Sequence, residues 1–123
     1  MYSHDPLTER IIGCAIAVHR VLGPGLVEAT YEEALCIELA DEGLRFSRQV
    51  GVPIPYRGRL IGEYRPDLVV EETVVVEIKS VDRLISLHQA QLLAYMRILR
   101  LPVGLLLNFN GETLRSGIRR LAI

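Results

Sequence analysis

Two acidic residues and one lysine in the middle of the chain form the pattern that is most suggestive of chemistry. Asp67 precedes Glu77 by ten residues, and Lys79 follows Glu77 by two. Residues two apart on a strand share a face, so Glu77 and Lys79 would stand side by side on a strand at 74–80. Such a pair is either a solvated ion pair, worth about 0–1 kcal/mol, or part of a site beneath a covering helix, where ions need partners.

The turn at 71–73 decides whether Asp67 joins this pair. If 71–73 is a three-residue loop, Val70 pairs with Val74 and Asp67 lies opposite Glu77 on the same face. If the loop has two residues, Asp67 lies opposite Val76 instead. The first register brings two carboxylates together, where they repel unless a proton or a metal ion intervenes. Hard oxygen ligands of this kind suit Mg²⁺ or Mn²⁺.

The choice of lysine at position 79 is itself informative. The chain has 14 basic residues besides histidine, and Lys79 is the one lysine among them. Arginine is a planar and permanently charged fork, whereas lysine is a compact point charge whose pKa shifts readily. The placement favours a site that needs an ammonium group. In the metal-free protein we expect burial and repulsion to raise the pKa of Asp67 or Glu77, unless Lys79 offsets them.

The elements that must position these residues can be read from hydrophobic spacing and turn signals. Asp5 and Pro6 open a helix that ends at the 23–25 break, and Gly43 ends a second helix. Ser86 and Gln89 form a capping-box pattern at the start of a third helix. The pattern predicts helices from Pro6 to Leu22, at 28–43 and from Ser86 to a point before Pro102, and strands at 46–56, 60–70, 74–80, 103–109 and 112–123.

The order of these elements predicts an α/β fold. The strands at 46–56, 60–70 and 74–80 form an antiparallel three-strand meander, with the first at an edge because it holds two prolines. A helix crossover then leads to a parallel strand at 103–109, so the sheet is mixed, with helices on its faces. The strand at 74–80 is therefore expected in the middle of the sheet.

Composition limits the class of protein. The 123 residues suffice for one domain, 1–123. No apolar run approaches the roughly 20 residues of a membrane span, and the N-terminus lacks a signal-peptide pattern. Cys14 and Cys36 fall in apolar helical patterns and are expected to be buried free thiols, so we expect a cytoplasmic protein. A net charge of −1 argues against nucleic-acid binding through overall charge but allows a local or metal-assisted site.

Three further motifs connect these residues to a known family. Pro66-Asp67 and Glu77-Ile78-Lys79 resemble the two halves of the signature of the PD-(D/E)XK nuclease superfamily. The segment 25–31 is similar to the Gly-x-x-Glu-x-x-Tyr signature of one small group in it, through Gly25, Glu28 and Tyr31. The segment 91–95 is similar to the Gln-x-x-x-Tyr element that follows in many relatives, through Gln91 and Tyr95.

The resemblance implies a restriction-endonuclease-like core and divalent-metal-dependent hydrolysis of phosphodiester bonds in nucleic acid, most of all DNA. It implies that Asp67, Glu77 and the Ile78 backbone carbonyl bind Mg²⁺ or Mn²⁺. Glu28 would complete the acidic cluster directly or through a water, or else it is only a carboxylate at a helix N-terminus. Lys79 would hold or activate the attacking water and offset developing negative charge.

Four residues have supporting roles in this interpretation, each with a structural alternative. Tyr31 would orient Glu28 or contact substrate, or it is a core tyrosine with a satisfied hydroxyl. Gln91 and Tyr95 would face the site and position a ligand, or they belong to a polar stripe on an amphipathic helix. His19 would be a metal ligand, as in some relatives, or a structural histidine.

Two other functions fit the same residues. One is a nucleic-acid-binding or partner-binding module that keeps the nuclease fold without turnover. The other is a structural role in which the charges form a buried ion network. A homodimer is also plausible, since small relatives often pair to act on two strands.

Overall fold

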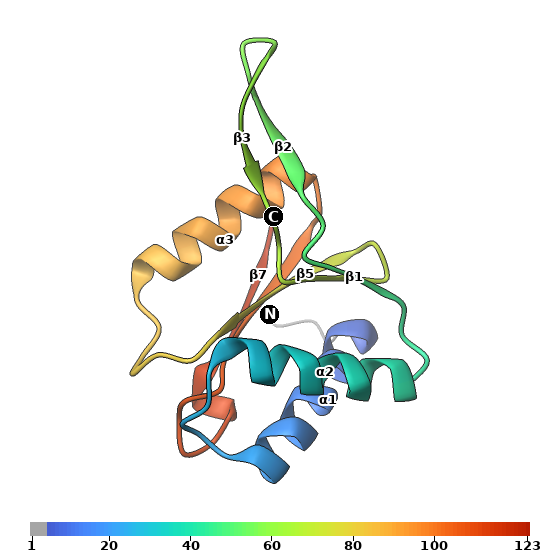
Figure 1. Cartoon of the computed structure of the whole chain (residues 1–123), viewed down its shortest axis with the longest axis vertical. Coiled ribbons are helices and arrows are strands. Elements are labelled where there is room, and N and C mark those ends of the chain that lie inside the picture. The colour runs from blue at the N-terminus through green and yellow to red at the C-terminus, as the bar shows by residue number, and fades with distance from the viewer. Residues whose placement is uncertain (1–4) are drawn as a thin grey trace.

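The computed structural model describes residues 5–123, in which helices cover a mixed five-stranded sheet and a separate two-stranded hairpin projects from it (Figure 1). The first four residues of the expected domain 1–123 lie outside the described residues. The helical elements are α1 (Pro6–Leu22), α2 (Glu28–Asp41), α3 (Ser86–Leu99) and the short 3-10 helix η1 (Arg115–Gly117). The strands of the main sheet, in spatial order, are β1 (Phe46–Arg48), β4 (Leu68–Val70), β5 (Val74–Lys79), β6 (Val103–Asn108) and β7 (Ile118–Ala122).

Strand β5 lies in the middle of the sheet, as the sequence predicts. It pairs antiparallel with β4 and parallel with β6, and α3 makes the crossover between β5 and β6. Parallel strands need such a long connection because the chain must return to the same end of the sheet. Strand β7 then returns antiparallel to β6. The expected mixed sheet and the helix crossover are both confirmed.

The register between β4 and β5 is the one that brings the acids together. Val70 pairs with Val74 and Leu68 pairs with Val76. The loop at 71–73 therefore has three residues, and Glu71 and Glu72 adopt positive φ angles of 52° and 54° that reverse the chain. Continuing this register by one residue places Asp67 opposite Glu77.

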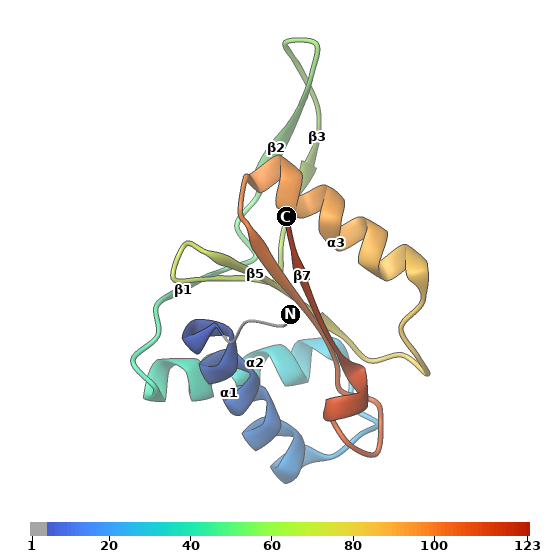
Figure 2. The same ribbon diagram turned by 180° about the vertical axis from the view of Figure 1, so that it is seen from behind.

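The expected meander is confirmed in its connectivity but not in its length. The strands predicted at 46–56 and 60–70 each split in two, and only β1 and β4 stay in the main sheet. The outer halves, β2 (Val52–Tyr56) and β3 (Arg59–Tyr64), pair with each other as a hairpin that leaves the body (Figures 1 and 2). The breaks fall at Gln49, where φ is 53°, and at Pro66, which has no N–H to donate to a ladder.

The helices form layers on the two faces of the sheet (Figure 1). Helices α1 and α2 pack on one face against Val74, Val76 and Ile78 of β5. Helix α3 packs on the other face, where Leu92 and Met96 contact Val75. Side chains alternate along a strand, so Glu77 and Lys79 share the α3 face with Val75.

Most helix ends follow their sequence signals. The Asp5 side chain accepts a hydrogen bond from the Leu7 N–H, with Pro6 as the first helical residue, and Gly43 follows α2 with a φ of 73°. The capping box predicted from Ser86 and Gln89 is wrong by one residue. Helix α3 begins at Ser86, so the residue that flanks it is Ile85, and the Ile85 N–H donates to Nδ1 of His88 at 3.1 Å.

The sequence also predicts the extent of the last strand and the state of the two cysteines. The last strand is shorter than predicted, because 115–117 forms η1 and leaves only Ile118–Ala122 in the sheet. Cys14 and Cys36 are buried free thiols, as expected. Within residues 5–123, every helix is too short or too polar to cross a membrane.

Candidate active site

Asp67 is hydrogen-bonded to Glu77 and to the Ile78 backbone across the open end of the β4–β5 ladder. The Asp67 backbone N–H donates to Oε2 of Glu77 at 2.9 Å, and the Ile78 backbone N–H donates to Oδ2 of Asp67 at 2.8 Å. The second bond forms because β4 begins only at Leu68, so the Asp67 side chain takes the place of a strand partner for Ile78. The three-residue-loop register therefore places both carboxylates at one point on the sheet.

Removal from water favours the neutral forms of both carboxyl groups, since Glu77 is buried and Asp67 is half-buried. Glu77 is only 8% exposed. Its burial and the negative charge of Asp67 raise its pKa to about 7, although the Asp67 N–H, Tyr64 and Lys79 pull in the other direction. Burial also raises the pKa of Asp67, with a smaller contribution from the charges of Glu32 and Glu28. The expected rise in pKa is confirmed, and it marks this pair as a candidate site.

Lys79 lies beside these acids without being tied to one of them. It ends β5 and is half-buried on the α3 face. It makes no ion pair with an acid among residues 5–123, although its charge helps to lower the pKa of Glu77. The alternative of a simple Glu77–Lys79 ion pair therefore has no contact to support it.

A hydrogen-bonded network that the sequence did not indicate holds Asp67 from the other side. The Gln49 side-chain amide donates to Oδ1 of Asp67 at 3.0 Å and to Oε1 of Glu32 at 2.9 Å. Arg48 Nε donates to the other oxygen of Glu32 at 2.6 Å, and Glu32 is 6% exposed. One signal was available, since Glu32 lies four residues after Glu28 and so on the same side of the helix. Nothing local marks Gln49.

Two tyrosines form the wall of the site on the α3 face. Tyr95 of α3 stacks on Tyr64, with 3.5 Å between ring centroids and 15° between ring planes. Burial raises the pKa of Tyr64, and so does the nearby negative charge of Glu77. The Tyr64 hydroxyl is buried but makes no hydrogen bond of standard geometry within residues 5–123. Gln91 lies one helical turn before Tyr95 and is half-buried. Sequence reasoning pointed to Tyr95 but not to Tyr64, and the role expected of Gln91 stays a prediction.

Within residues 5–123, Glu28 makes no hydrogen bond with Asp67 or Glu77, although it is near enough to Asp67 for its charge to raise the pKa of that carboxyl. It is exposed at the first residue of α2, on the helix that packs against the opposite face of the sheet. Within residues 5–123, no group of three or more His, Cys, Asp or Glu side chains is arranged to hold a metal ion. Glu28 acts on Asp67 only through its charge.

Tyr31 and His19 occupy structural positions. The Tyr31 side chain is fully buried and stacks on Phe109 with 4.6 Å between ring centroids. Its hydroxyl donates to the Gly23 carbonyl at 2.5 Å and accepts from the Leu26 N–H at 3.1 Å. His19 is 8% exposed, and its Nε2 lies 2.9 Å from the Gly111 carbonyl oxygen. These contacts fit the structural alternatives, in which Tyr31 is a core tyrosine with a satisfied hydroxyl and His19 is a structural histidine.

We expect Tyr31→Phe to lower the free energy of unfolding by about 1–3 kcal/mol, because it leaves the Gly23 carbonyl and the Leu26 N–H without their buried partner. Urea denaturation would measure the change. The control is Tyr56→Phe, at a side chain that is 60% exposed, where a change within about 0.5 kcal/mol is expected. Equal stabilities for Tyr31→Phe and the wild type would contradict this role.

The oxygen atoms at the Asp67–Glu77 pair suit a magnesium ion. N–H and C=O of one residue point to the same edge of an antiparallel strand, so the Ile78 carbonyl faces the side on which Ile78 N–H meets Asp67. Mg²⁺ prefers hard oxygen ligands and is often held by only one or two carboxylates, with water and phosphate completing its shell. Asp67, Glu77 and the Ile78 carbonyl fit that requirement without Glu28.

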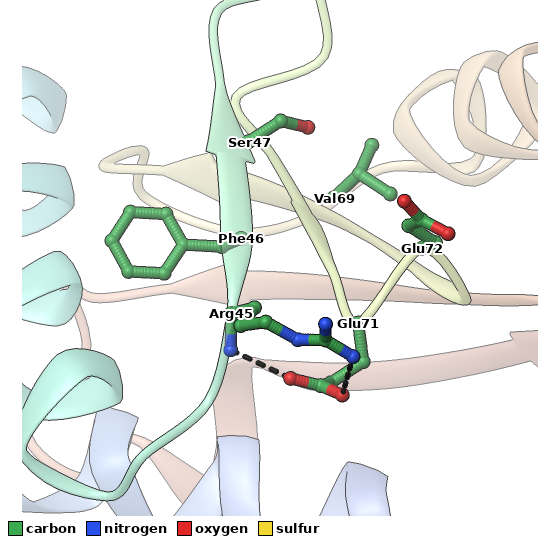
Figure 3. Close-up of a pocket in the computed structure, with 6 residues that line it drawn as sticks. All are labelled: Arg45, Phe46, Ser47, Val69, Glu71 and Glu72. Carbon is green, nitrogen blue, oxygen red and sulfur yellow. Dashed lines mark hydrogen bonds and ion pairs between the residues drawn. The ribbon is translucent and has the colours of Figure 1, made fainter.

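A concave region elsewhere on the sheet is a structural feature rather than part of this site (Figure 3). It lies at the far ends of β1 and β4 from Asp67. Glu71 accepts a hydrogen bond there from the Arg45 N–H at 2.6 Å and pairs with the Arg45 guanidinium at 3.5 Å. These contacts fix the 71–73 turn, and hence the register that aligns Asp67 with Glu77.

Comparison with known proteins gives one match. The family model of the PD-(D/E)XK nuclease superfamily matches residues 5–121. No curated protein and no solved structure gives a significant match. Together with the mixed sheet, the match confirms the restriction-endonuclease-like fold that the resemblance implies.

Proposed function

Because the chain belongs to the PD-(D/E)XK nuclease superfamily, we propose that it is a Mg²⁺- or Mn²⁺-dependent nuclease that hydrolyses phosphodiester bonds, most of all in DNA. The observation that carries this proposal is the Asp67–Glu77 pair beside Lys79. A buried acid, Glu77, and a half-buried one, Asp67, both with raised pKa values, stand next to an ammonium group that has no acid partner within residues 5–123. A merely structural network would have neutralised these charges internally.

Metal binding, orientation of the ligands and activation of water would fall to different residues. Asp67, Glu77 and the Ile78 carbonyl would hold Mg²⁺, which when bound supplies polarisation of a phosphate and a lower pKa for water. Because the pKa of Glu77 is about 7 without metal, ion binding must displace a proton, so affinity rises with pH through neutrality. Gln49 keeps Asp67 oriented by donating to Oδ1. Lys79 would orient a water molecule for attack and stabilise the negative charge that develops on the phosphate.

Three further parts of the proposal concern the compartment, the oligomeric state and the subfamily. The buried free thiols of Cys14 and Cys36 suit a reducing cytoplasm. A symmetric dimer would present two such sites to the two strands of a duplex. The Gly-x-x-Glu-x-x-Tyr group is the subfamily we propose, with its tyrosine serving the fold through the loop at 23–26.

We expect Lys79→Arg to fold normally and bind Mn²⁺ but to cleave at least about tenfold more slowly, an effect near 1.4 kcal/mol. The longer planar guanidinium cannot occupy the point at which a compact ammonium sits. The measurement is an initial-rate assay with Mg²⁺ or Mn²⁺ over duplex DNA, single-stranded DNA and RNA.

The control for this experiment is Arg83→Lys, which makes the reverse exchange at an exposed position and should leave turnover largely intact. Lys79→Ala shows the rate without any ammonium. Cleavage by Lys79→Arg at the wild-type rate would contradict the role assigned to Lys79. If the wild type cleaves none of these nucleic acids with either metal ion, a non-catalytic binding module would be favoured.

A further inference from the structure

The β2–β3 hairpin is a second feature of this molecule that no catalytic role explains. It projects away from the sheet and helices in both views (Figures 1 and 2). Three large apolar side chains near its tip lie in solvent: Tyr56 is 60% exposed, Leu60 is 71% exposed and Ile61 is 64% exposed. Exposed apolar side chains gathered at one projecting point mark an interaction site.

The turn at the tip carries arginine where another residue would be more stable. Arg57 and Gly58 both have positive φ angles, of 50° and 79°, as a type I′ turn requires. Asn or Gly is typical at the first of these positions, whereas a bulky residue with positive φ is uncommon. Arg57 is followed closely by Arg59, and both are exposed. The turn therefore presents both arginine side chains to solvent at the end of the hairpin.

The charge of the hairpin differs in sign from that of the whole chain. Segment 52–65 holds Arg57, Arg59 and Arg65 against Glu63, a net charge of +2 in a chain of −1. Glu63 pairs with Arg65 at 3.0 Å. Within residues 5–123, Arg57 and Arg59 make no ion pair with an acid. The two tip arginines therefore present uncompensated positive charge to solvent.

The hairpin is connected directly to the candidate active site. Strand β3 ends at Tyr64, and three residues later the chain reaches Asp67. Tyr64 stacks on Tyr95 of α3, so the base of the hairpin is anchored to the helix that covers the site. A molecule held at the tip would thus extend along the hairpin towards the Asp67–Glu77 pair.

We propose that the tip of this hairpin binds duplex DNA and holds it beside the active site. Arg57 and Arg59 contact phosphates, and the apolar side chains contact the groove. A two-stranded ribbon fits the major groove, which is about 12 Å wide, and apolar side chains contact the thymine methyl groups that line it. This inference rests on the proposed nuclease function.

Charge favours DNA over a second copy of the chain as the occupant. Two hairpins meeting tip to tip would bring four uncompensated guanidinium groups together, whereas phosphates neutralise them. Pro53 and Pro55 also deprive β2 of two backbone donors, which disfavours extension of the ribbon by a further strand.

The experiment compares the salt dependence of DNA binding in the wild type and in Arg57→Gln/Arg59→Gln. Each arginine that neutralises a phosphate adds about 0.9 to the slope of log K against log salt. The double variant should bind a short fluorescent duplex more weakly, with a slope shallower by about 1.8. Between about 50 and 200 mM salt the wild type should therefore lose about 12-fold more affinity than the variant does. Anisotropy in EDTA measures this without cleavage.

The matched control is Arg20→Gln/Arg115→Gln, which removes the same charge from exposed positions in α1 and η1, two elements that lie away from the hairpin (Figure 1). It should keep the wild-type slope. The proposal is overturned if the control loses as much slope as the tip variant, if the wild type does not bind the duplex, or if the tip variant affects only single-stranded DNA. It is also overturned if the tip variant instead changes the sedimentation of the free protein, which would identify a second copy as the occupant.

Failure here and failure of the nuclease proposal give different results. An unchanged slope in the tip variant, together with Lys79-dependent cleavage, rejects the hairpin proposal alone. A slope shallower by about 1.8 without metal-dependent cleavage rejects turnover and keeps the hairpin as a DNA-binding element.

Discussion

Glu77→Gln should make the metal-free protein more stable than the wild type at pH 8, by about 3 kcal/mol, and should leave it nearly unchanged at pH 4. The pKa of Glu77 is about 7 in the folded protein, against an ordinary value of 4.5, because the carboxyl is buried beside Asp67. One pKa unit corresponds to about 1.4 kcal/mol. Gln keeps an oxygen that can accept from the Asp67 N–H and carries no charge to bury.

The direction follows from proton linkage. A raised folded-state pKa means that the folded protein binds the proton more tightly than the unfolded chain does. The stability from Glu77 is therefore fully present below about pH 4.5 and is lost as pH rises through about 7. Asp67, whose pKa is also raised, adds to the loss in the same direction.

Urea denaturation in EDTA at several pH values would measure this difference. Glu112→Gln, at an exposed position, is the matched control. Its free energy of unfolding should depend on pH as that of the wild type does, because Glu77 is intact. A Glu77→Gln variant that is less stable than the wild type at pH 8 would contradict the burial of an uncompensated carboxylate.

The sequence predicts those features of the site that depend on residues close together in the chain. Strand alternation places Glu77 beside Lys79, and the length of the 71–73 turn limits Asp67 to two registers. Both registers can be derived from the sequence, but the contacts that select one of them cannot. The Arg45–Glu71 pair spans 26 residues and fixes the turn from a strand that is not adjacent in sequence.

The errors of prediction come from backbone breaks and long-range contacts. A strand pattern continues through Gln49 and Pro66, yet the chain turns at both and releases the β2–β3 hairpin. Glu32 and Gln49 are separated by 17 residues, so their contact appears only once α2 lies over the end of β1. The Tyr64–Tyr95 stack depends likewise on where the hairpin base meets α3.

Glu28 shows how a motif can be right in spacing without determining a role. Its position relative to Gly25 and Tyr31 fits the family pattern, and Tyr31 is accounted for by the loop at 23–26. Glu28 itself begins a helix on the face opposite Lys79. Helical spacing predicts which residues share a side of α2, but it cannot say how that side meets the edge of the sheet.

Asp67→Asn should reduce cleavage by at least about 10³-fold, since it removes a charged ligand from a site whose metal supplies several kcal/mol of transition-state stabilisation. The fold should survive this change. Asn keeps one oxygen that can accept from the Ile78 N–H, as Oδ2 of Asp67 does at 2.8 Å. It also removes a charge whose burial raises the pKa of Asp67, but its N–H₂ group then faces the Gln49 amide that donates to Oδ1 of Asp67, so the stability at neutral pH should stay within about 1–2 kcal/mol of the wild type.

This combination of retained stability and lost turnover separates a catalytic acid from a structural one. Initial rates with Mg²⁺ and a Mn²⁺ titration by calorimetry would measure the two effects, and Asp41→Asn, at the exposed end of α2, is the matched control. Gln49→Ala should have a smaller effect, about 10- to 100-fold in metal affinity, because Gln49 orients Asp67 without replacing it as a ligand. If Asp67→Asn instead bound Mn²⁺ and cleaved as the wild type does, Asp67 would be a partner for the Ile78 and Gln49 donors only, and the metal would have to be held elsewhere.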